Sequence, residues 1–405
     1  MEWKHYKMDE LIEEISMGPF GSDVKKEFYV DNGVPILNGS NLQGFKLQED
    51  SFGYLTKEKA DSLKKCNAHR GDIIVTHRGT LGQIVYVPVN SKYDRYVISQ
   101  SQFRFRCKAD LVDVQYLVYY FHTREGQYKI LANASQVGVP ALARATSTFR
   151  LIDIKLPPLN DQRRIASILS SLDRKIELNN KINADLEEMA QAIFKNWFVD
   201  FEPFKDGKFV DSELGMIPEG WKVGRLEDIA EITMGQSPAG NSLNENREGM
   251  MFYQGSSDFG FRFPSIRVFT TEPKRLAVAN SVLFSVRAPV GDINVAKEEC
   301  CIGRGVASIK SKSSHDSYLF YTMKSLHKLF DSFDGEGTVF GSINKKTLSA
   351  IQILLPSEGI VEQFNDVASS FDNRIRCLSE ESSRLSLLRD TLLPRLMSGE
   401  LEVPE

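Results

Sequence analysis

Short apolar runs, separated by glycine, asparagine and serine, fill two stretches of the chain, residues 1–158 and 219–357. Runs such as those in 71–79 and 281–287 are bounded by turn residues and predict strands joined by loops. Two longer apolar segments predict helices, at 113–132 and 316–330. Each stretch closes with a strand that ends in proline, so both are expected to fold as mixed α/β domains within an α+β protein.

Two much longer segments carry apolar residues at three- and four-residue steps. In 160–198 the series begins Ile165, Leu169, Leu172, and in 358–393 it begins Phe364, Val367, Phe371. A narrow apolar seam of this kind is typical of a coiled coil, and about 38 residues of helix would extend roughly 57 Å. The alternative is that each helix packs on its own domain.

The two halves of the chain repeat one pattern. Residues 71–86 and 280–295 align at an offset of 209, which places Arg78 on Arg287 and Gly82 on Gly291. A period near 200 residues is too long for a solenoid and indicates two copies of a domain with its helical tail. The expected boundaries are a first domain at 1–158, a helical region at 159–200, a linker at 201–218, a second domain at 219–357 and a second helical region at 358–405.

Composition narrows the function classes. The net charge of −4 does not indicate an isolated nucleic-acid binder, although residues 1–158 carry 21 Lys and Arg against 18 Asp and Glu. No run is long and apolar enough for a membrane span, and the start of the chain lacks a signal region, so a cytoplasmic protein is expected. The sequence holds no GxxxxGK[ST], GxSxG or HExxH motif. We therefore expect no catalytic residues, no metal and no cofactor.

Four long strings resemble the specificity subunit of type I restriction–modification enzymes. They are LPPLNDQRRIASILSSLDRKIELNN (156–180), AIFKNWFVDFEPF (192–204), SELGMIPEGWKVGRLEDIAEITMGQSP (212–238) and LLPRLMSGEL (392–401). The resemblance implies two target-recognition domains, separated by two long helices that form an antiparallel coiled coil with a pseudo-two-fold repeat. One departure is visible, because the second helix lacks the DQRRIA and WF strings of the first.

The resemblance also implies a function. The chain would read a bipartite site on double-stranded DNA without catalysis of its own, and would bind two modification subunits that use S-adenosylmethionine to methylate adenine. Restriction subunits that cut DNA with ATP would join them. Two alternatives remain at this point: a module for a methyltransferase without a nuclease, and a two-lobed scaffold that binds only protein.

Candidate DNA-binding residues follow from matching side chains to groove edges, with Arg suited to guanine and Asn or Gln to adenine. The alternatives are a surface ion pair for the arginines and an ordinary polar turn for the others. The candidates are Asn38, Ser40, Asn41, His77, Arg78, Thr80 and Arg144 in the first copy, and Gln254, Ser256, Ser257, Arg287, Lys345 and Lys346 in the second. Of these, Arg144, Lys345 and Lys346 would position phosphates.

Candidate partner-docking residues lie in the first helical region. Trp197, Phe198 and Phe201 form an aromatic cluster near its end, for which the alternative is an intramolecular core. Arg163 and Arg164 are the other candidates, for which the alternative is a solvated helix face.

Overall fold

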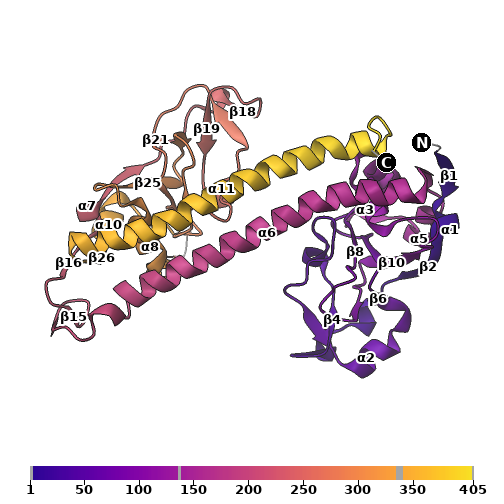
Figure 1. Ribbon diagram of the computed structural model, residues 1–405, viewed down its shortest axis with the longest axis horizontal. Helices are drawn as coiled ribbons and strands as arrows, with labels where there is room; N and C mark the ends of the chain where they lie inside the picture. The colour runs from indigo at the N-terminus through magenta and orange to yellow at the C-terminus, as the bar shows by residue number, and fades with distance from the viewer. Residues whose placement is uncertain (1–2, 136–137, 334–340, 404–405) are drawn as a thin grey trace. The chain divides into compact units, whose positions relative to one another are not determined.

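The computed structural model describes residues 3–135, 138–333 and 341–403. The chain divides into two compact units, called here unit 1 (residues 1–178 with 381–405) and unit 2 (residues 179–380). The boundary cuts across the two long helices, α6 (Leu159–Phe198) and α11 (Glu358–Met397), which are magenta and yellow in Figure 1. Each unit thus combines a mixed α/β region with the first half of its own long helix and the last half of the other.

Unit 1 is built on two sheets. One has the order β2-β10-β7-β8, with strands at Ile12–Met17, Gln102–Cys107, Ile73–Thr76 and Ile84–Tyr86. The other has the order β3-β5-β4-β9-β6, with strands at Tyr29–Val30, Gly53–Leu55, Val34–Ile36, Arg95–Val97 and Asn67–His69. The pairs β1 (Lys4–Lys7) with β13 (Asp153–Leu156) and β11 (Ala134–Ser135) with β12 (Ala141–Leu142) complete the strands described. Its shorter helices are α1 (Met8–Leu11), α2 (Lys57–Ser62), α3 (Val114–His122), α4 (Arg124–Leu131) and α5 (Ala145–Arg150).

Unit 2 repeats this plan. One sheet has the order β17-β25-β22-β23, with strands at Ala230–Met234, Val306–Ser311, Val282–Ser285 and Ile293–Val295. The other has the order β18-β20-β19-β24-β21, with strands at Leu243–Asn244, Val268–Thr270, Met250–Tyr253, Cys300–Ile302 and Leu276–Ala277. β16 (Lys222–Arg225) pairs with β26 (Gln352–Leu355), and the helices are α7 (Leu226–Ile229), α8 (Asp316–Ser325), α9 (His327–Asp331) and α10 (Lys345–Ser349). The equivalent strand orders confirm the internal repeat.

The two medium helices expected at 113–132 and 316–330 are each interrupted. In unit 1 the break falls at Thr123, whose backbone is extended (φ −69°, ψ 161°) and whose hydroxyl accepts a hydrogen bond of 3.1 Å from the Gly126 amide. Thr123 therefore ends α3 and caps α4. A Cβ atom at Gly126 would lie 2.3 Å from the Tyr120 carbonyl oxygen, so glycine permits the close packing of this corner.

Within each unit the halves of α6 and α11 run antiparallel. In unit 1, Lys175 pairs with Glu381 at 3.3 Å and Asp173 with Arg389 at 2.7 Å. In unit 2, the Asn183 amide donates to the Ser379 hydroxyl at 3.2 Å. Rising numbers on α6 thus meet falling numbers on α11, as the coiled-coil prediction requires.

Apolar residues of the two long helices are also buried in the cores of the α/β regions. The alternative, in which each long helix packs on a domain, is therefore also part of the structure. In unit 1, Ile165 and Leu169 of α6 and Leu396 of α11 are buried in a core with Phe103, Phe105 and the helix α3. In unit 2, Phe194 of α6 and Phe364 of α11 are buried with the helix α8. Each α/β region is therefore packed against one half of both long helices.

The predicted linker at 201–218 is folded rather than extended. It contains a pair of short strands, β14 (Phe209–Val210) and β15 (Ile217–Pro218). The ring of Trp221 contacts Phe201 and Phe204 at centroid distances of 5.5 and 5.2 Å. Aromatic packing against Trp221 thus holds the segment 201–218 against the start of the second α/β region.

Candidate nucleic-acid interface

In unit 1, the ends of β2 and β7 and the start of β10 meet at one edge of the sheet β2-β10-β7-β8. Because β10 is antiparallel to both β2 and β7, the start of β10 lies beside the ends of its two neighbours. The amide of Gly18, after β2, donates to the Gln102 carbonyl at 2.8 Å, and the amide of His77, after β7, donates to the Ser101 carbonyl at 2.9 Å. We call this the reading edge of unit 1.

The other loops predicted for the first copy join the same edge. The Gly79 amide donates to the Pro140 carbonyl at 2.9 Å, which brings the loop before β12 beside Arg78. The Gln102 amide group donates to the Asn38 carbonyl at 3.3 Å, which brings in the turn at 38–42. Five distant parts of the sequence, around Gly18, Asn38, His77, Ser101 and Pro140, are therefore brought together at this edge.

Unit 2 has an equivalent reading edge on the sheet β17-β25-β22-β23. The Gly235 amide donates to the Val306 carbonyl at 2.9 Å, and the Val286 amide donates to the Gly305 carbonyl at 3.0 Å. Arg287 forms an isolated β-bridge with Ser342, as Arg78 does with Ala141 in unit 1. In the segments that lead to Lys345 and to Arg144, residues 334–340 and 136–137 lie outside the described residues.

Arg78 and Arg287 occupy equivalent, exposed positions on these edges. Among the described residues, neither side chain has a carboxylate within 4 Å, so the surface ion pair considered for them is not formed there. The glycine four residues after each arginine is in the left-handed region, with φ of 82° at Gly82 and 101° at Gly291. Only glycine adopts this conformation without strain, which explains why the motif recurs in both copies.

Most polar side chains of the turn at 38–42 form hydrogen bonds within the turn or to the backbone of the loop that follows it. Asn41 is fully buried, and its amide group donates to the carbonyls of Gln48 (3.2 Å) and Asp50 (2.7 Å). The prediction of Asn41 as a DNA-binding residue is therefore corrected to a structural role, because a buried and fully paired amide cannot reach a base. Asn38 and Ser40 are exposed, but the Asn38 side-chain oxygen already accepts from the Ser40 amide at 2.8 Å.

His77 lies half-buried beneath the exposed part of the edge. Its Nε2 atom is 3.2 Å from the Gln100 carbonyl oxygen. Burial lowers the pKa of His77, although hydrogen bonds to the backbone oppose the shift. His77 is thus expected to be neutral at pH 7 and to support the turn that carries Arg78, while Thr80 is exposed on the same turn.

The remaining candidates are exposed or half-exposed at the same edges. In unit 2 the Gln254 side chain accepts a hydrogen bond of 2.9 Å from Ser237, and Ser256 and Ser257 follow it in a short helical turn. Lys345 and Lys346 are exposed at the start of α10. Arg144 is exposed before α5, with a left-handed φ of 49°. The assignment of Arg144, Lys345 and Lys346 to phosphate contacts stays a prediction.

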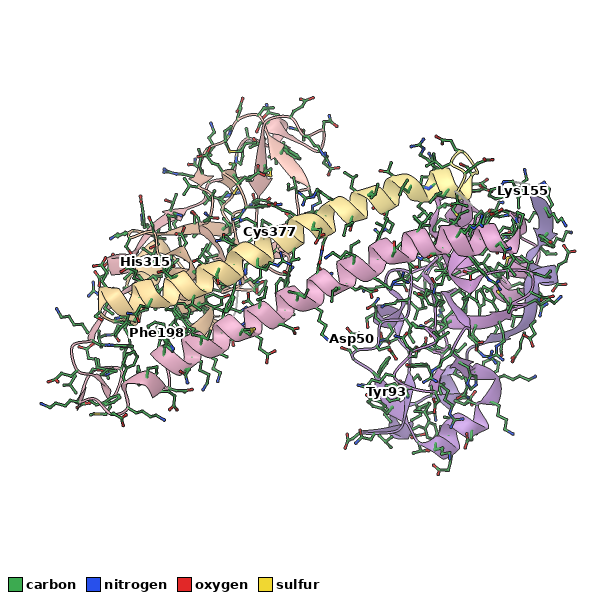
Figure 2. The ribbon with its side chains drawn as sticks, viewed as in Figure 1. Asp50, Tyr93, Lys155, Phe198, His315 and Cys377 are labelled. Carbon is green, nitrogen blue, oxygen red and sulfur yellow. The ribbon has the colours of Figure 1, made fainter. Side chains whose placement is uncertain are left out.

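The aromatic cluster proposed for partner docking is used inside unit 2. Phe198, labelled in Figure 2, is only 6% exposed and packs against Trp221, Tyr318 and Phe364. Its assignment as a docking residue is corrected to a core residue, since its surface is already covered. Trp197 and Phe201 are half-buried around it, and Arg163 and Arg164 are exposed on α6.

A second pair of equivalent sites joins each α/β region to the long helices. In unit 1 the Tyr119 hydroxyl donates to Asp173, which also pairs with Arg389 at 2.7 Å. In unit 2 the Tyr321 hydroxyl donates to Asp372 at 3.2 Å, and Asp372 pairs with Arg262 at 2.7 Å. The tyrosine and aspartate are repeated, but the arginine comes from α11 in unit 1 and from a loop in unit 2.

Arg262 is the most buried charge of this second site. Burial alone would lower the pKa of its guanidinium, but Asp372, Tyr321 and Glu187 raise it above its ordinary value. A cavity of about 170 Å³ beside it is lined in part by Asp316, Asp372 and Arg376. Arg376 donates to the Lys297 carbonyl at 3.0 Å, and Asp316 pairs with Lys310 at 2.6 Å, so these groups belong to the structural network.

Two features are absent from residues 3–135, 138–333 and 341–403. No group of three or more His, Cys, Asp or Glu side chains there is arranged to hold a metal ion. Among the same residues, no helix is both long and apolar enough to cross a membrane.

The chain is similar in sequence and in fold to known proteins. The family model described as the type I restriction modification DNA specificity domain matches residues 1–188 and 218–385, which is one match for each copy. The chain belongs to this family. The family's role is the recognition of DNA sequence and not catalysis.

The following relatives match over nearly their whole length. A Methanocaldococcus jannaschii protein that carries the name of the type I restriction enzyme MjaX specificity subunit is 29% identical, with 99% of this chain and 94% of the relative covered. The type I restriction enzyme HindI specificity subunit of Haemophilus influenzae is 24% identical, with 99% and 100% covered. The crystal structure of the type I restriction–modification system S subunit from M. genitalium has a TM-score of 0.61 at 17% identity, with 98% and 96% covered. That structure supports the fold of this specificity subunit.

Sequence reasoning missed one element of each reading edge. The turns at 99–101 and 303–305 lie between the strand ends already described, through the Ser101 and Gly305 carbonyls. Aligning strands 102–107 and 306–311 within the repeat would have placed Gln100 and Arg304 at equivalent positions.

Proposed function

We propose that this specificity subunit reads a bipartite site on double-stranded DNA, with one half-site contacted by each reading edge. The observation that carries the proposal is the repetition of the edge. Both units bring the ends of two strands and a later loop together around an exposed arginine with no carboxylate partner among the described residues. Side chains on turns held by a rigid sheet can enter a groove and form bidentate contacts with base edges.

The subunit would act within a larger complex in the cytoplasm. Two modification subunits would bind it and methylate adenine, and restriction subunits would join for cleavage. The repeat supports two equivalent partners, because a chain with two similar units offers two similar surfaces. Exposed parts of α6 that include Arg163 and Arg164, and the half-buried rings of Trp197 and Phe201, are the proposed contacts.

Genome-wide mapping of methylated adenines in cells that express this chain with its modification subunits tests the proposal. The expected result is one methylated motif made of two short specific sequences separated by an unspecified gap. Exchange of unit 2 loops for those of another specificity subunit should change only one of the two sequences. Methylation without sequence preference, or none beyond cells that lack this chain, would favour the protein-only scaffold.

The same mapping addresses the methyltransferase-only alternative when it is combined with a restriction assay. Cells that carry the complete system should restrict unmodified phage DNA if restriction subunits join the complex. Methylation with no restriction would identify a module that serves modification alone.

A further inference from the structure

The turns before β10 and β25 hold the same place in the two units. In unit 1, Phe103 of β10 lies opposite Met17, and in unit 2, Ala307 of β25 lies opposite Met234. Gln100 lies three residues before Phe103, and Arg304 lies three residues before Ala307. The two residues therefore hold equivalent positions in the turns before the strands. Both are exposed.

The backbone on either side of Arg304 is tightly held. The Gly303 amide donates to the Tyr253 carbonyl at 2.8 Å, and the Gly305 amide donates to the Gln254 carbonyl at 3.1 Å. A Cβ atom at Gly303 would lie 2.4 Å from Oε1 of Gln254, and one at Gly305 would lie 2.4 Å from the Gln254 carbonyl oxygen. Glycine is required at 305, where the obstacle is backbone, whereas a Cβ atom at 303 would displace the Gln254 side chain and press on the Phe252 ring. The turn therefore presents Arg304 from a rigid base.

The turn around Gln100 is held by different bonds in unit 1. The Ser99 amide donates to Oε1 of Gln102 at 2.9 Å, and the hydroxyls of Ser99 and Ser101 lie 2.9 Å apart. The Gln100 carbonyl oxygen is 3.2 Å from Nε2 of His77, which ties the turn to the Arg78 loop. Both turns close with an equivalent backbone hydrogen bond, from the Gln102 amide to the Ser99 carbonyl at 3.1 Å and from the Val306 amide to the Gly303 carbonyl at 2.9 Å. The side-chain contacts around this shared bond differ between the two copies.

The position of these turns favours contact with bases over contact with phosphates. Each begins the strand that has a reading loop on both sides, after β2 and β7 in unit 1 and after β17 and β22 in unit 2. Among the described residues, Arg304 has no carboxylate within 4 Å of its guanidinium. Arg and Gln are also the side chains that pair bidentately with guanine and adenine in the major groove.

We propose that Gln100 and Arg304 are base-reading residues, each of which specifies one base pair in the half-site contacted by its own unit. This inference rests on the proposed function in DNA recognition. Arg304 fits a guanine, and Gln100 fits an adenine. With Arg78 and Arg287, each unit then presents two readers on neighbouring strand ends.

The experiment compares Arg304→Ala, Arg304→Lys and Gln100→Ala in the complete complex by methylation mapping and by DNA binding at several salt concentrations. Arg304→Ala should relax the preference at one base pair of the half-site read by unit 2, by roughly 5- to 150-fold. Lysine keeps the charge but lacks the planar fork, so Arg304→Lys should relax the same base pair while general affinity is retained. Gln100→Ala should relax one base pair of the other half-site only.

Each variant contains its own control, because the half-site read by the unchanged unit must stay specific if the complex has folded. Arg225→Ala removes an exposed arginine of β16, away from the edge, and should leave both half-sites unchanged. A phosphate contact would give a different result. Arg304→Ala would then weaken binding to all DNA sequences and lower its salt dependence, while Arg304→Lys would keep wild-type selectivity. This result would overturn the inference. Unchanged recognition in Arg304→Ala and Gln100→Ala would also overturn it. Failure of the proposed function looks different, because the unaltered chain would then direct no specific methylation.

Discussion

Replacement of Arg262 by methionine should selectively destabilise unit 2. The Arg262 side chain is 3% exposed and forms ion pairs with Glu187 and, at 2.7 Å, with Asp372. It also donates to the Tyr321 hydroxyl at 2.9 Å and lies 4.0 Å from the centre of the Phe320 ring. Methionine keeps an unbranched apolar side chain of similar length but leaves the two carboxylates without this cation.

The magnitude follows from the burial of the groups that remain. Removal of one partner from a buried ion pair costs about 3–5 kcal/mol, because the other charge stays buried without compensation. Lys324 still pairs with Glu187, so the lower end, about 3 kcal/mol, is expected for Arg262→Met. For a unit of this size that free energy lowers the melting temperature by roughly 6–12 °C.

Arg389→Met provides the matched control in unit 1. Arg389 and Asp173 are 18% and 17% exposed, and Arg389 lies 4.9 Å from the centre of the Phe45 ring. Water reaches this pair, so the cost should be smaller, roughly 1–2 kcal/mol, and confined to unit 1.

Urea unfolding followed by tryptophan fluorescence separates the two units. Trp197 and Trp221 lie in unit 2 and Trp3 in unit 1. A Trp3→Phe background therefore reports unit 2 for Arg262→Met, and a Trp197→Phe, Trp221→Phe background reports unit 1 for Arg389→Met. Adding Glu187→Gln and Asp372→Asn to Arg262→Met should restore most of the lost stability. The reasoning is refuted if Arg262→Met costs no more than Arg389→Met, or if removal of both carboxylates brings no recovery.

Three further predictions concern recognition and pH. Arg78→Ala and Arg287→Ala should each relax one half-site by about 1–3 kcal/mol in methylation mapping, and equal damage to both half-sites would exclude these turns as readers. The pKa of His122 is lowered by burial below 6.5, so the unfolded chain binds more protons, and its contribution to stability is full above pH 6.5 and lost as pH falls below it. Unit 1 should therefore unfold at lower urea concentration at pH 5.5 than at pH 7.5, and His122→Gln should reduce that difference. Because the net charge is −4, the isolated chain should bind DNA weakly in a fluorescence anisotropy assay, and modification subunits should tighten binding and steepen its salt dependence. Nanomolar, site-specific binding by the chain alone would contradict this.

Several features of the fold could be predicted from local pattern alone. The periodic apolar positions of the two long helices depend on neighbours three and four residues away, and α6 and α11 begin within a residue of their expected starts. The repeat of Arg78 and Gly82 in Arg287 and Gly291 could be seen because both copies need a left-handed glycine at the same turn. The short apolar runs bounded by turn residues likewise indicated strands, and β7 and β22 are buried along their whole length.

Contacts between distant segments decided the rest. The sequence around Asn41 looks like an exposed polar turn, but the carbonyls of Gln48 and Asp50 satisfy its amide and bury it. Phe198 resembles a docking aromatic until the rings of unit 2 cover it. The role of a polar or aromatic side chain depends on the residues that surround it, and these lie a few positions away for Asn41 but more than a hundred positions away for Phe198.

By itself, the sequence determined two copies of an α/β region, two long seamed helices and the loops that carry arginine. Tertiary structure alone decided that each unit takes half of the other copy's helix, and that Asp173 meets Arg389 whereas its counterpart Asp372 meets Arg262. It also decided that Gln100 and Arg304 stand between the strand ends of the reading edges. The physical reason is that periodicity records which face of an element is buried, whereas partner choice depends on how antiparallel strands and helices bring remote residues into register.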